Sequence, residues 1–156
     1  MQIRAYRPED WPRLCLIHDQ ARKDELRDAG LAEAFLPLHV AAEREGLFDY
    51  TVLVAEDADT VLGFVAFSDD ELCWLYVDPA YYRRGVGAAL VKAAVASAPG
   101  ALTMEVLEGN AAALSFYQAC GFHPVRTAQG WMPGNESFAV TVQVLEHMPR
   151  RDQQGS

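Results

Sequence analysis

The sequence predicts a mixed α/β domain of the α+β class, with a central, mostly antiparallel mixed sheet of about seven strands and about four flanking helices. Three short apolar runs lie between residues 51 and 77, separated by polar turn residues, a pattern typical of an antiparallel meander. A stretch at helical spacing then separates the third run from a fourth at residues 102–106. Because a helical crossover joins parallel strands, that pair is expected to be parallel.

The strands are indicated by alternating or continuously apolar residues between turn residues. Gly63 interrupts one strand and suggests a bulge. Asp78 and Pro79 end the next one, because proline cannot continue a strand ladder. The stretch 128–137 contains glycine, proline and asparagine and is expected to be a loop. The expected strands cover residues 2–6, 51–55, 61–67, 71–77, 102–106, 122–127 and 138–145.

Four segments carry helical signals. Pro8 suits a first helical turn, because no amide partner is needed there. Asn110 is a favourable N-cap for the last helix, and Gly121 follows that helix as a C-terminal glycine. The expected helices cover Pro8 to about Lys23, Leu31 towards Glu45, Val86 to about Ser97, and Asn110 to Ala119.

Length and charge limit the class of protein. A chain of 156 residues is expected to form one domain, over residues 1–149, followed by a disordered polar tail at 150–156. With 22 acidic and 13 basic residues the formal charge is -9, which disfavours nucleic acid and anionic membranes as partners. No apolar run is long enough to span a membrane and no signal peptide begins the chain, so a cytoplasmic protein is expected.

The cysteines and histidines show no ligand pattern. Cys15, Cys73 and Cys120 have neither metal-ligand nor redox spacing, and they are expected to be reduced and mostly buried. The four histidines also lack ligand spacing. No metal is therefore expected.

Residues 76–90 predict a strand, a loop and the start of a helix, and the loop is a candidate anion site. The first-turn amides of a helix lack partners within it, and the helix dipole adds partial positive charge. Gly85 and Gly87 have no Cβ that would keep a ligand away from these amides. The loop therefore suits a phosphate or pyrophosphate, although an ordinary glycine-bearing loop explains a single Gly-x-Gly equally well.

The stretch 110–122, NAAALSFYQACGF, resembles the Asn-x-x-Ala-x-x-Phe-Tyr-x-x-x-Gly-Phe signature of the GNAT superfamily of N-acetyltransferases. The order around it matches as well: a strand ending in Val77-Asp78-Pro79, a Tyr-x-Arg-Arg-Gly-x-Gly-like loop, another strand, and then this helix. The likeness covers essentially the whole chain and is strongest over 63–122. It implies the GNAT fold, in which the sheet is splayed between two central strands.

The resemblance also implies that acetyl coenzyme A is the cosubstrate. The pantetheine arm would pair with the backbone around Leu75, Tyr76 and Val77, and Asn110 matches a position that reaches this arm. Tyr117 matches the position near the sulfur. One departure is Tyr82, where the family usually has Gln or Arg, so the loop backbone would carry more of the binding. The residues matching the pyrophosphate site are Arg83, Arg84, Gly85, Val86, Gly87 and Ala88.

Acyl transfer from a thioester to an amine needs a neutral amine, a polarised carbonyl and a proton for the leaving thiolate. Tyr117, which the motif places at the sulfur, is the expected donor, because a phenol of pKa ~10 is protonated at neutral pH and a thiol has a pKa of ~8.5. A tyrosine packed in the core is the alternative. A backbone amide near residues 75–77 would polarise the carbonyl.

Glu71 matches a glutamate that some members of the superfamily use as general base. Its ordinary pKa of ~4.3, against ~10.4 for an alkyl amine, makes direct proton removal uphill. A solvated acid, with water taking the proton, is therefore an equal alternative. Cys120 at a helix C-terminus and Cys73 on an apolar strand both disfavour a thiolate, so direct transfer in a ternary complex is favoured over an acyl-enzyme.

The resemblance implies that the first two helices and the 128–137 loop bind the acceptor. Acids beside aromatic residues there could hold a cationic amine, although solvated helix faces and a core phenylalanine explain them at least as well. The candidates are Glu33, Phe35, His39, Glu43 and Trp131.

The predicted function is transfer of an acetyl group from acetyl coenzyme A to a primary amine of a small molecule or protein. A non-catalytic acyl coenzyme A binding or regulatory module on the same fold is the alternative. A nucleotide or dinucleotide binder is disfavoured, because the loop has no third glycine at Rossmann spacing and no Walker lysine. Exposed edge strands leave homodimerisation open.

Overall fold

The structure is a computed structural model, and it describes residues 1–149. The tail expected to be disordered, residues 150–156, lies outside the described residues. The strands are β1 (Gln2–Ala5), β2 (Thr51–Asp57), β3 (Thr60–Phe67), β4 (Leu72–Val77), β5 (Leu102–Leu107), β6 (His123–Met132) and β7 (Asn135–His147). The helices are α1 (Trp11–Asp28), α2 (Leu38–Glu45), α3 (Val86–Ser97) and α4 (Ala111–Ala119). Short 3-10 turns are η1 (Pro8–Asp10), η2 (Ala32–Ala34), η3 (Leu47–Asp49) and η4 (Pro79–Tyr81).

The strands form two antiparallel sheets, in the orders β1-β2-β3-β4 and β5-β7-β6. The sheets meet at the first residues of β4 and β5, where Glu71 and Thr103 form a parallel bridge and the Thr103 amide donates to the Asp70 carbonyl at 2.9 Å. Within residues 1–149 no further ladder joins the two strands, so they separate beyond this point. The predicted mixed α+β fold and the parallel orientation of this strand pair are confirmed.

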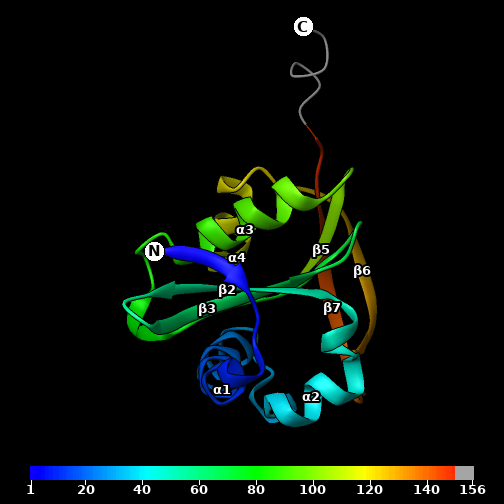
Figure 1. The fold of residues 1–156 in the computed structure, drawn as a ribbon. Helices are drawn as coiled ribbons and strands as arrows, with labels where there is room; N and C mark the ends of the chain where they lie inside the picture. Colours follow the sequence, from blue (N-terminus) through cyan, green and yellow to red (C-terminus); the bar gives the residue numbers. More distant parts are fainter. Residues whose placement is uncertain (150–156) are drawn as a thin grey trace, which may run out of the picture.

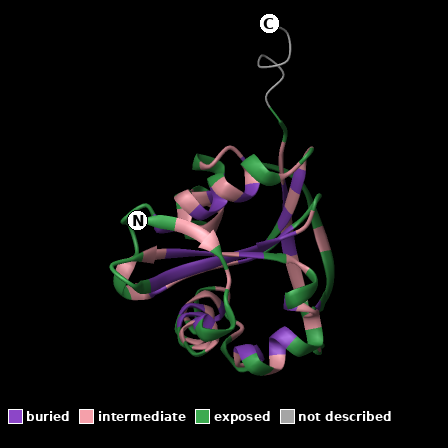
Figure 2. Cartoon of the chain, viewed as in Figure 1, coloured by how far each residue is buried: buried purple, intermediate pink, exposed green. Residues whose placement is uncertain are grey.

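Helices cover both faces of the first sheet, with α3 and α4 on one side and α1 and α2 on the other (Figure 1). Residues of the central strand β3 alternate between the two layers. Val65 packs in a cluster with Leu90 of α3, whereas Phe64 packs with Leu14 and Ile17 of α1. Strand β3 is consequently buried along nearly its whole length (Figure 2). No helix within residues 1–149 is long and apolar enough to cross a membrane.

The N-terminal helices differ from the prediction at two boundaries. Helix α1 continues to Asp28, beyond Lys23, because Leu26 is fully buried and the i,i+3 pairs of its last turns support the helix. The second helix was expected to begin at Leu31, but a 3-10 turn and an extended segment precede α2. Pro37 explains the break, because the residue before a proline is disfavoured in the helical conformation.

The stretch 128–137 is not the loop that the sequence predicts. Strands β6 and β7 continue through it as a hairpin and pair until Met132 and Asn135, so only Pro133 and Gly134 form the turn. The left-handed φ of +72° at Gly134 allows this tight connection. Long cross-strand pairing therefore outweighs the local turn signals. By contrast, the bulge expected at Gly63 is present, because the register shifts opposite it, between Ala55 and Glu56.

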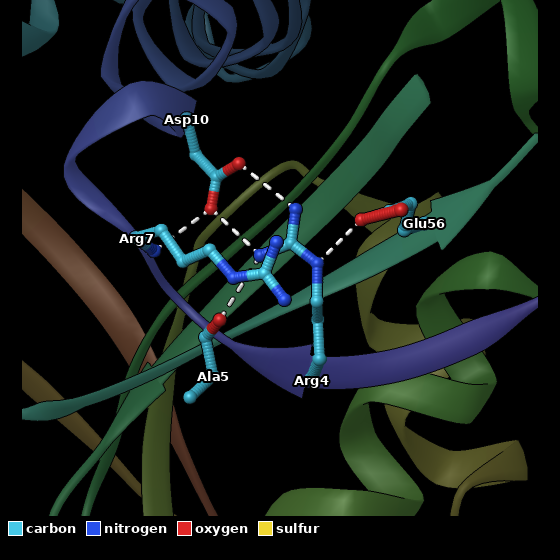
Figure 3. A network of polar contacts seen from close by, with 5 residues as sticks. All are labelled: Arg4, Ala5, Arg7, Asp10 and Glu56. Carbon is cyan, nitrogen blue, oxygen red and sulfur yellow. Dashed lines mark hydrogen bonds and ion pairs between the residues drawn. The ribbon is translucent and has the colours of Figure 1, made fainter. Parts of the chain in front are cut away.

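A polar network joins β1 to the entry of α1 (Figure 3). The Arg4 guanidinium donates to both Asp10 carboxylate oxygens at 2.9 Å and also pairs with Glu56 on β2. The Arg7 amide donates to Asp10 at 2.8 Å. Asp10 is only 7% exposed, so these partners replace the water that its carboxylate loses on folding.

This network makes stability depend on pH through Asp10. The hydrogen bonds from Arg4, opposed by burial and assisted by the Arg7 amide, lower the pKa of Asp10. The stabilisation is therefore present above the unfolded pKa of ~3.9 and is lost as the pH falls through the lower folded value. We expect Asp10→Asn to lower the free energy of unfolding at pH 7 by about 2 kcal/mol. This loss should shrink in acid, measured by urea unfolding between pH 7 and pH 3. The exposed Asp69→Asn should show neither effect.

Candidate active site

A cavity of about 700 Å³ opens between the two sheets, where β4 and β5 separate. Both strands contribute to its wall, together with the C-terminal half of α1, the end of α2, helix α4 and the β6–β7 hairpin. The fold thus brings together side chains from distant parts of the chain. Those relevant to chemistry are His18, Arg22, Glu25, Arg44, Glu45, Tyr50, Glu71, Cys73, Tyr76, Glu105, Tyr117, Arg126, Trp131 and Glu136.

Tyr117 enters the cavity from α4 and is 8% exposed. Its ring makes edge contacts with Phe116 and Phe122, which fix its position. Within residues 1–149 its hydroxyl has no hydrogen-bond partner. Every fully buried side-chain polar atom in this part of the chain has a partner, so this hydroxyl is not fully buried. The hydroxyl is therefore reached from the cavity. Burial first, and then the charge of Glu25, raise the pKa of Tyr117 well above its ordinary value, so the group stays protonated.

Glu25 of α1 links this helix to β4. Its Oε1 accepts a hydrogen bond from Arg22 at 2.5 Å and another from the Tyr76 hydroxyl at 3.3 Å. A second nitrogen of Arg22 lies 3.6 Å from the Met132 sulfur on β6. His18 lies one turn before Arg22 on the same helix face. Its ring packs edge-on against the Tyr76 ring, with 4.8 Å between the ring centroids.

The hairpin tip is held over the end of α2. Arg44 donates to the Gly134 carbonyl at 2.9 Å, and Asn135 donates to the Ala34 carbonyl at 3.1 Å. Beside this tip, burial raises the pKa of Glu45 to about 7, with Arg22 opposing the rise and Glu136 adding to it. Glu45 therefore changes its charge near neutral pH, at the wall of the cavity.

The predicted anion loop has the expected local geometry. Gly85 is the N-cap of α3 in a left-handed conformation, with φ +81°, and the first helical hydrogen bond runs from the Ala89 amide to the Gly85 carbonyl at 3.0 Å. The amides from Gly85 to Ala88 thus precede the helical ladder. A Cβ on Gly85 would meet open space, whereas one on Gly87 would lie 3.1 Å from the Phe116 ring. Gly85 thus leaves room for a ligand, and Gly87 allows α3 to pack against α4.

Asn110 caps α4, as the sequence predicts. Its side-chain oxygen accepts from the Ala113 amide at 3.2 Å, and the residue is 8% exposed. Its amide nitrogen donates to no group within residues 1–149 and remains available as a donor.

The structure collects only some of the predicted site residues in the cavity. Glu71, Leu75, Tyr76, Tyr117 and Trp131 line it. The predicted acceptor residues on the N-terminal segments do not: Glu33, His39 and Glu43 are exposed, and Phe35 packs beside Leu26, Ala34 and Met132. Val77, Asn110 and the loop residues Arg83 to Ala88 lie outside the lining as well.

Cys73 was expected to be buried and is exposed, while Cys15 and Cys120 are half-buried. The register of β4 shifts at Cys73, so Leu72 and Trp74 are buried in different core clusters while Cys73 between them is exposed and lines the cavity. Partial desolvation nevertheless raises the pKa of Cys73 to about 11, with Glu71 adding to the rise. A thiolate nucleophile remains disfavoured at this position.

The sequence analysis does not predict the polar stripe of α1 as part of the site. His18, Arg22 and Glu25 are spaced i, i+4 and i+7, so they share one helix face, and that face lines the cavity. His18 is itself buried, as are the apolar residues Leu14, Ile17 and Ala21 of the same helix. In the sequence, polar residues that interrupt the buried stripe of a helix are the signal that could have indicated these cavity residues.

The comparisons with known proteins agree with this arrangement. A family profile described as "Acetyltransferase (GNAT) domain" matches residues 48–124. The protein named Uncharacterized N-acetyltransferase YafP, from Escherichia coli K12, is 30% identical over 129 residues, which are 81% of this chain and 83% of YafP. The chain belongs to the GNAT superfamily of N-acetyltransferases.

Other GNAT proteins resemble shorter stretches of the chain or the fold alone. Peptidyl-lysine N-acetyltransferase YjaB from Salmonella typhimurium is 38% identical over 66 residues, 42% of this chain and 45% of YjaB, so the match spans under half of that relative. A GCN5-related N-acetyltransferase from Rhodopseudomonas palustris superposes with a TM-score of 0.75 at 22% identity, covering 95% of both chains. The yncA structure from Salmonella typhimurium, solved with its cofactor acetyl-CoA, has a TM-score of 0.68 at 20% identity and covers 95% of this chain and 93% of its own.

Proposed function

We propose that this GNAT protein transfers an acetyl group from acetyl coenzyme A to a primary amine, by direct attack in a ternary complex. The observation that carries the proposal is Tyr117, a buried residue whose hydroxyl has no hydrogen-bond partner within residues 1–149 and is reached from the cavity between the diverging strands. A donor held in a desolvated pocket stabilises charge that develops beside it.

The chain's own residues fit the cosubstrate. The free amides from Gly85 to Ala88, beside the exposed Arg83 and Arg84, suit the pyrophosphate. One edge of β4 pairs with β3, and beyond the Glu71 bridge the other edge pairs with no strand within residues 1–149. An extended pantetheine arm can use this edge from Leu75 to Val77, and the amide nitrogen of Asn110 can donate to it.

The chemistry of thioester cleavage gives Tyr117 a role in stabilising the leaving group. As the amine nitrogen bonds to the acetyl carbon, the carbon–sulfur bond breaks and negative charge develops on sulfur. Because the pKa of Tyr117 is raised above its ordinary value, complete proton transfer to a thiolate of pKa ~8.5 is costly. Tyr117 therefore acts chiefly by donating a hydrogen bond to the sulfur, and the ammonium proton replaces any proton that the tyrosine gives up.

Glu71 keeps its proposed role as a base and lines the same cavity, although water remains the alternative proton acceptor. Trp131 on β6, 63% exposed, is a proposed contact for the acceptor chain. A peptidyl lysine is a reasonable first acceptor, because the relative YjaB is named for that activity. A homodimer remains a proposal.

Coenzyme binding can be tested separately at Gly85. A valine there would need a left-handed backbone that costs a non-glycine residue about 1–2 kcal/mol, and it would cover the free amides. We expect Gly85→Val to raise the Kd for acetyl coenzyme A at least about tenfold, measured by calorimetry. Gly100→Val is the matched control, because Gly100 has no positive φ and open space around it, and it should bind as the wild type does.

The function itself is tested by incubating the protein with acetyl coenzyme A and a panel of amines, amino acids and lysine peptides. We expect amine-dependent release of free thiol and an acetylated product of the corresponding mass. Tight coenzyme binding without transfer to any amine would contradict the proposal and favour a non-catalytic binding module.

A further inference from the structure

The cavity holds an unused carboxylate oxygen as well as an unused hydroxyl. Glu25 receives both of its described hydrogen bonds, from Arg22 and Tyr76, on Oε1. No group within residues 1–149 donates to its Oε2. Glu25 lines the cavity, and its side chain is 31% exposed there. A charged oxygen that can still accept hydrogen bonds therefore faces the space into which an acceptor must enter.

Glu25 lies near the reacting end of this space. Its charge contributes to the rise in the pKa of both Tyr117 and Tyr76, which places it within electrostatic reach of both phenols. Tyr117 is nine-tenths buried and its hydroxyl is unpaired in the described chain, so two groups without a complete set of partners converge on one volume. A primary amine next to a thioester matches this pair, since its N–H groups donate to a carboxylate while the sulfur accepts from the phenol.

We propose that Glu25 binds the amine of the acceptor, which enters as a cation and gives a proton to water before it attacks, and orients it opposite Tyr117, with Arg22 and Tyr76 as positioning residues. This inference rests on the proposed function and narrows its substrate class. The preferred acceptors are aliphatic primary amines, which are cationic at neutral pH. Weakly basic aromatic amines gain nothing from Glu25.

The geometry sets Glu25 apart from an ordinary helix-surface pair. Exposed i,i+3 pairs contribute little and connect only one helix. Here Arg22 and Glu25 are 20% and 31% exposed, Glu25 also contacts β4 through Tyr76, and Arg22 reaches the Met132 sulfur on β6. Three elements thus hold the carboxylate in one orientation.

Glu25 and Glu71 serve different ends of the cavity. Glu71 lies just before β4 and precedes Tyr76 by five residues, which is at most about 16 Å along an extended strand. Glu25 touches the Tyr76 end, where the unpaired strand edge and Tyr117 meet. An amine bound at Glu25 lies far from Glu71, so this inference favours water over Glu71 as the acceptor of the amine proton.

The test compares a cation with an uncharged molecule of the same shape. The probes are Nα-acetyl-lysine amide and its alcohol analogue, Nα-acetyl-6-hydroxynorleucine amide, titrated into the protein saturated with coenzyme A. Glu25→Gln keeps an acceptor for Tyr76 and removes the charge. We expect it to weaken binding of the amine about 30-fold, to leave the alcohol nearly unaffected, and to raise KM for the amine more than it lowers kcat.

Controls separate this inference from folding and from the proposed function. Asp24→Asn makes the same charge change one residue away, outside the cavity lining, and should leave both probes unaffected. Tyr76→Phe removes only the supporting hydroxyl and should weaken amine binding by a smaller factor. The inference is overturned if Glu25→Gln weakens binding of the amine and of the alcohol equally, or weakens neither. It is also overturned if the wild-type protein binds the alcohol as tightly as the amine. A wild-type protein that binds neither probe but acetylates aromatic amines overturns it too. A wild-type protein that acetylates no amine overturns the proposed function instead.

Discussion

Tyr117→Phe is expected to lower kcat about 100-fold while the Kd for acetyl coenzyme A stays close to that of the wild type. The substitution removes only the hydroxyl and keeps the ring, whose contacts with Phe116 and Phe122 hold α4 in the core. The departing sulfur then loses its donor in a place where water is largely excluded, because Tyr117 is 8% exposed. Steady-state kinetics and calorimetry on the same protein separate the two effects.

The matched variant is Tyr6→Phe, which removes a hydroxyl outside the cavity lining and should leave kcat unchanged. If Tyr117→Phe retained full turnover, Tyr117 would be a packing residue and the leaving thiolate would take its proton from water. If turnover and coenzyme affinity fell together, the hydroxyl would serve binding rather than the transfer step.

Most of the fold could be predicted because its signals are local. Asn110 and Gly121 bound α4 through hydrogen bonds that they make within a few residues, and Asp78-Pro79 ends β4 in the same way. The errors arose where distant contacts decide. Local turn residues at 128–137 favour a loop, but pairing with β7 extends β6 to Met132. Pro37, by contrast, is a local signal, and it marks the start of α2 at Leu38.

The candidate site also has a part that local sequence signals predict and a part that distant contacts decide. Motif spacing locates Tyr117 and the α3 loop, because each lies in one continuous segment. The proposed acceptor site depends on how α1 is rotated against β4, and this rotation is a tertiary property. It turns Glu25 and Arg22 into the cavity, whereas Glu33 and His39, which lie on later segments, are exposed. Composition could suggest acids near the acceptor but could not select among them.

Gly63→Val is expected to be the most destabilising substitution near the site. Gly63 pairs with Val77 in the β3–β4 ladder, and a Cβ there would lie 2.8 Å from the Tyr76 carbonyl oxygen, 3.3 Å from the Val77 Cα and 3.2 Å from a Leu90 methyl group. Two of these three contacts are with backbone, which cannot rotate away as a flexible side chain can. We expect a loss of about 3 kcal/mol in the free energy of unfolding, measured by urea titration.

The same clash links stability to function, because relief of it must move β4 at Tyr76 and Val77. That strand edge is the proposed site of the pantetheine arm, and Tyr76 also supports Glu25. The folded fraction of Gly63→Val should therefore bind acetyl coenzyme A more weakly than wild type. Gly130→Val on β6 meets nothing within 4 Å and should lose neither stability nor affinity. Wild-type stability in Gly63→Val would mean that β3 and β4 can separate without cost. The strand edge would then be too compliant to position a thioester opposite Tyr117.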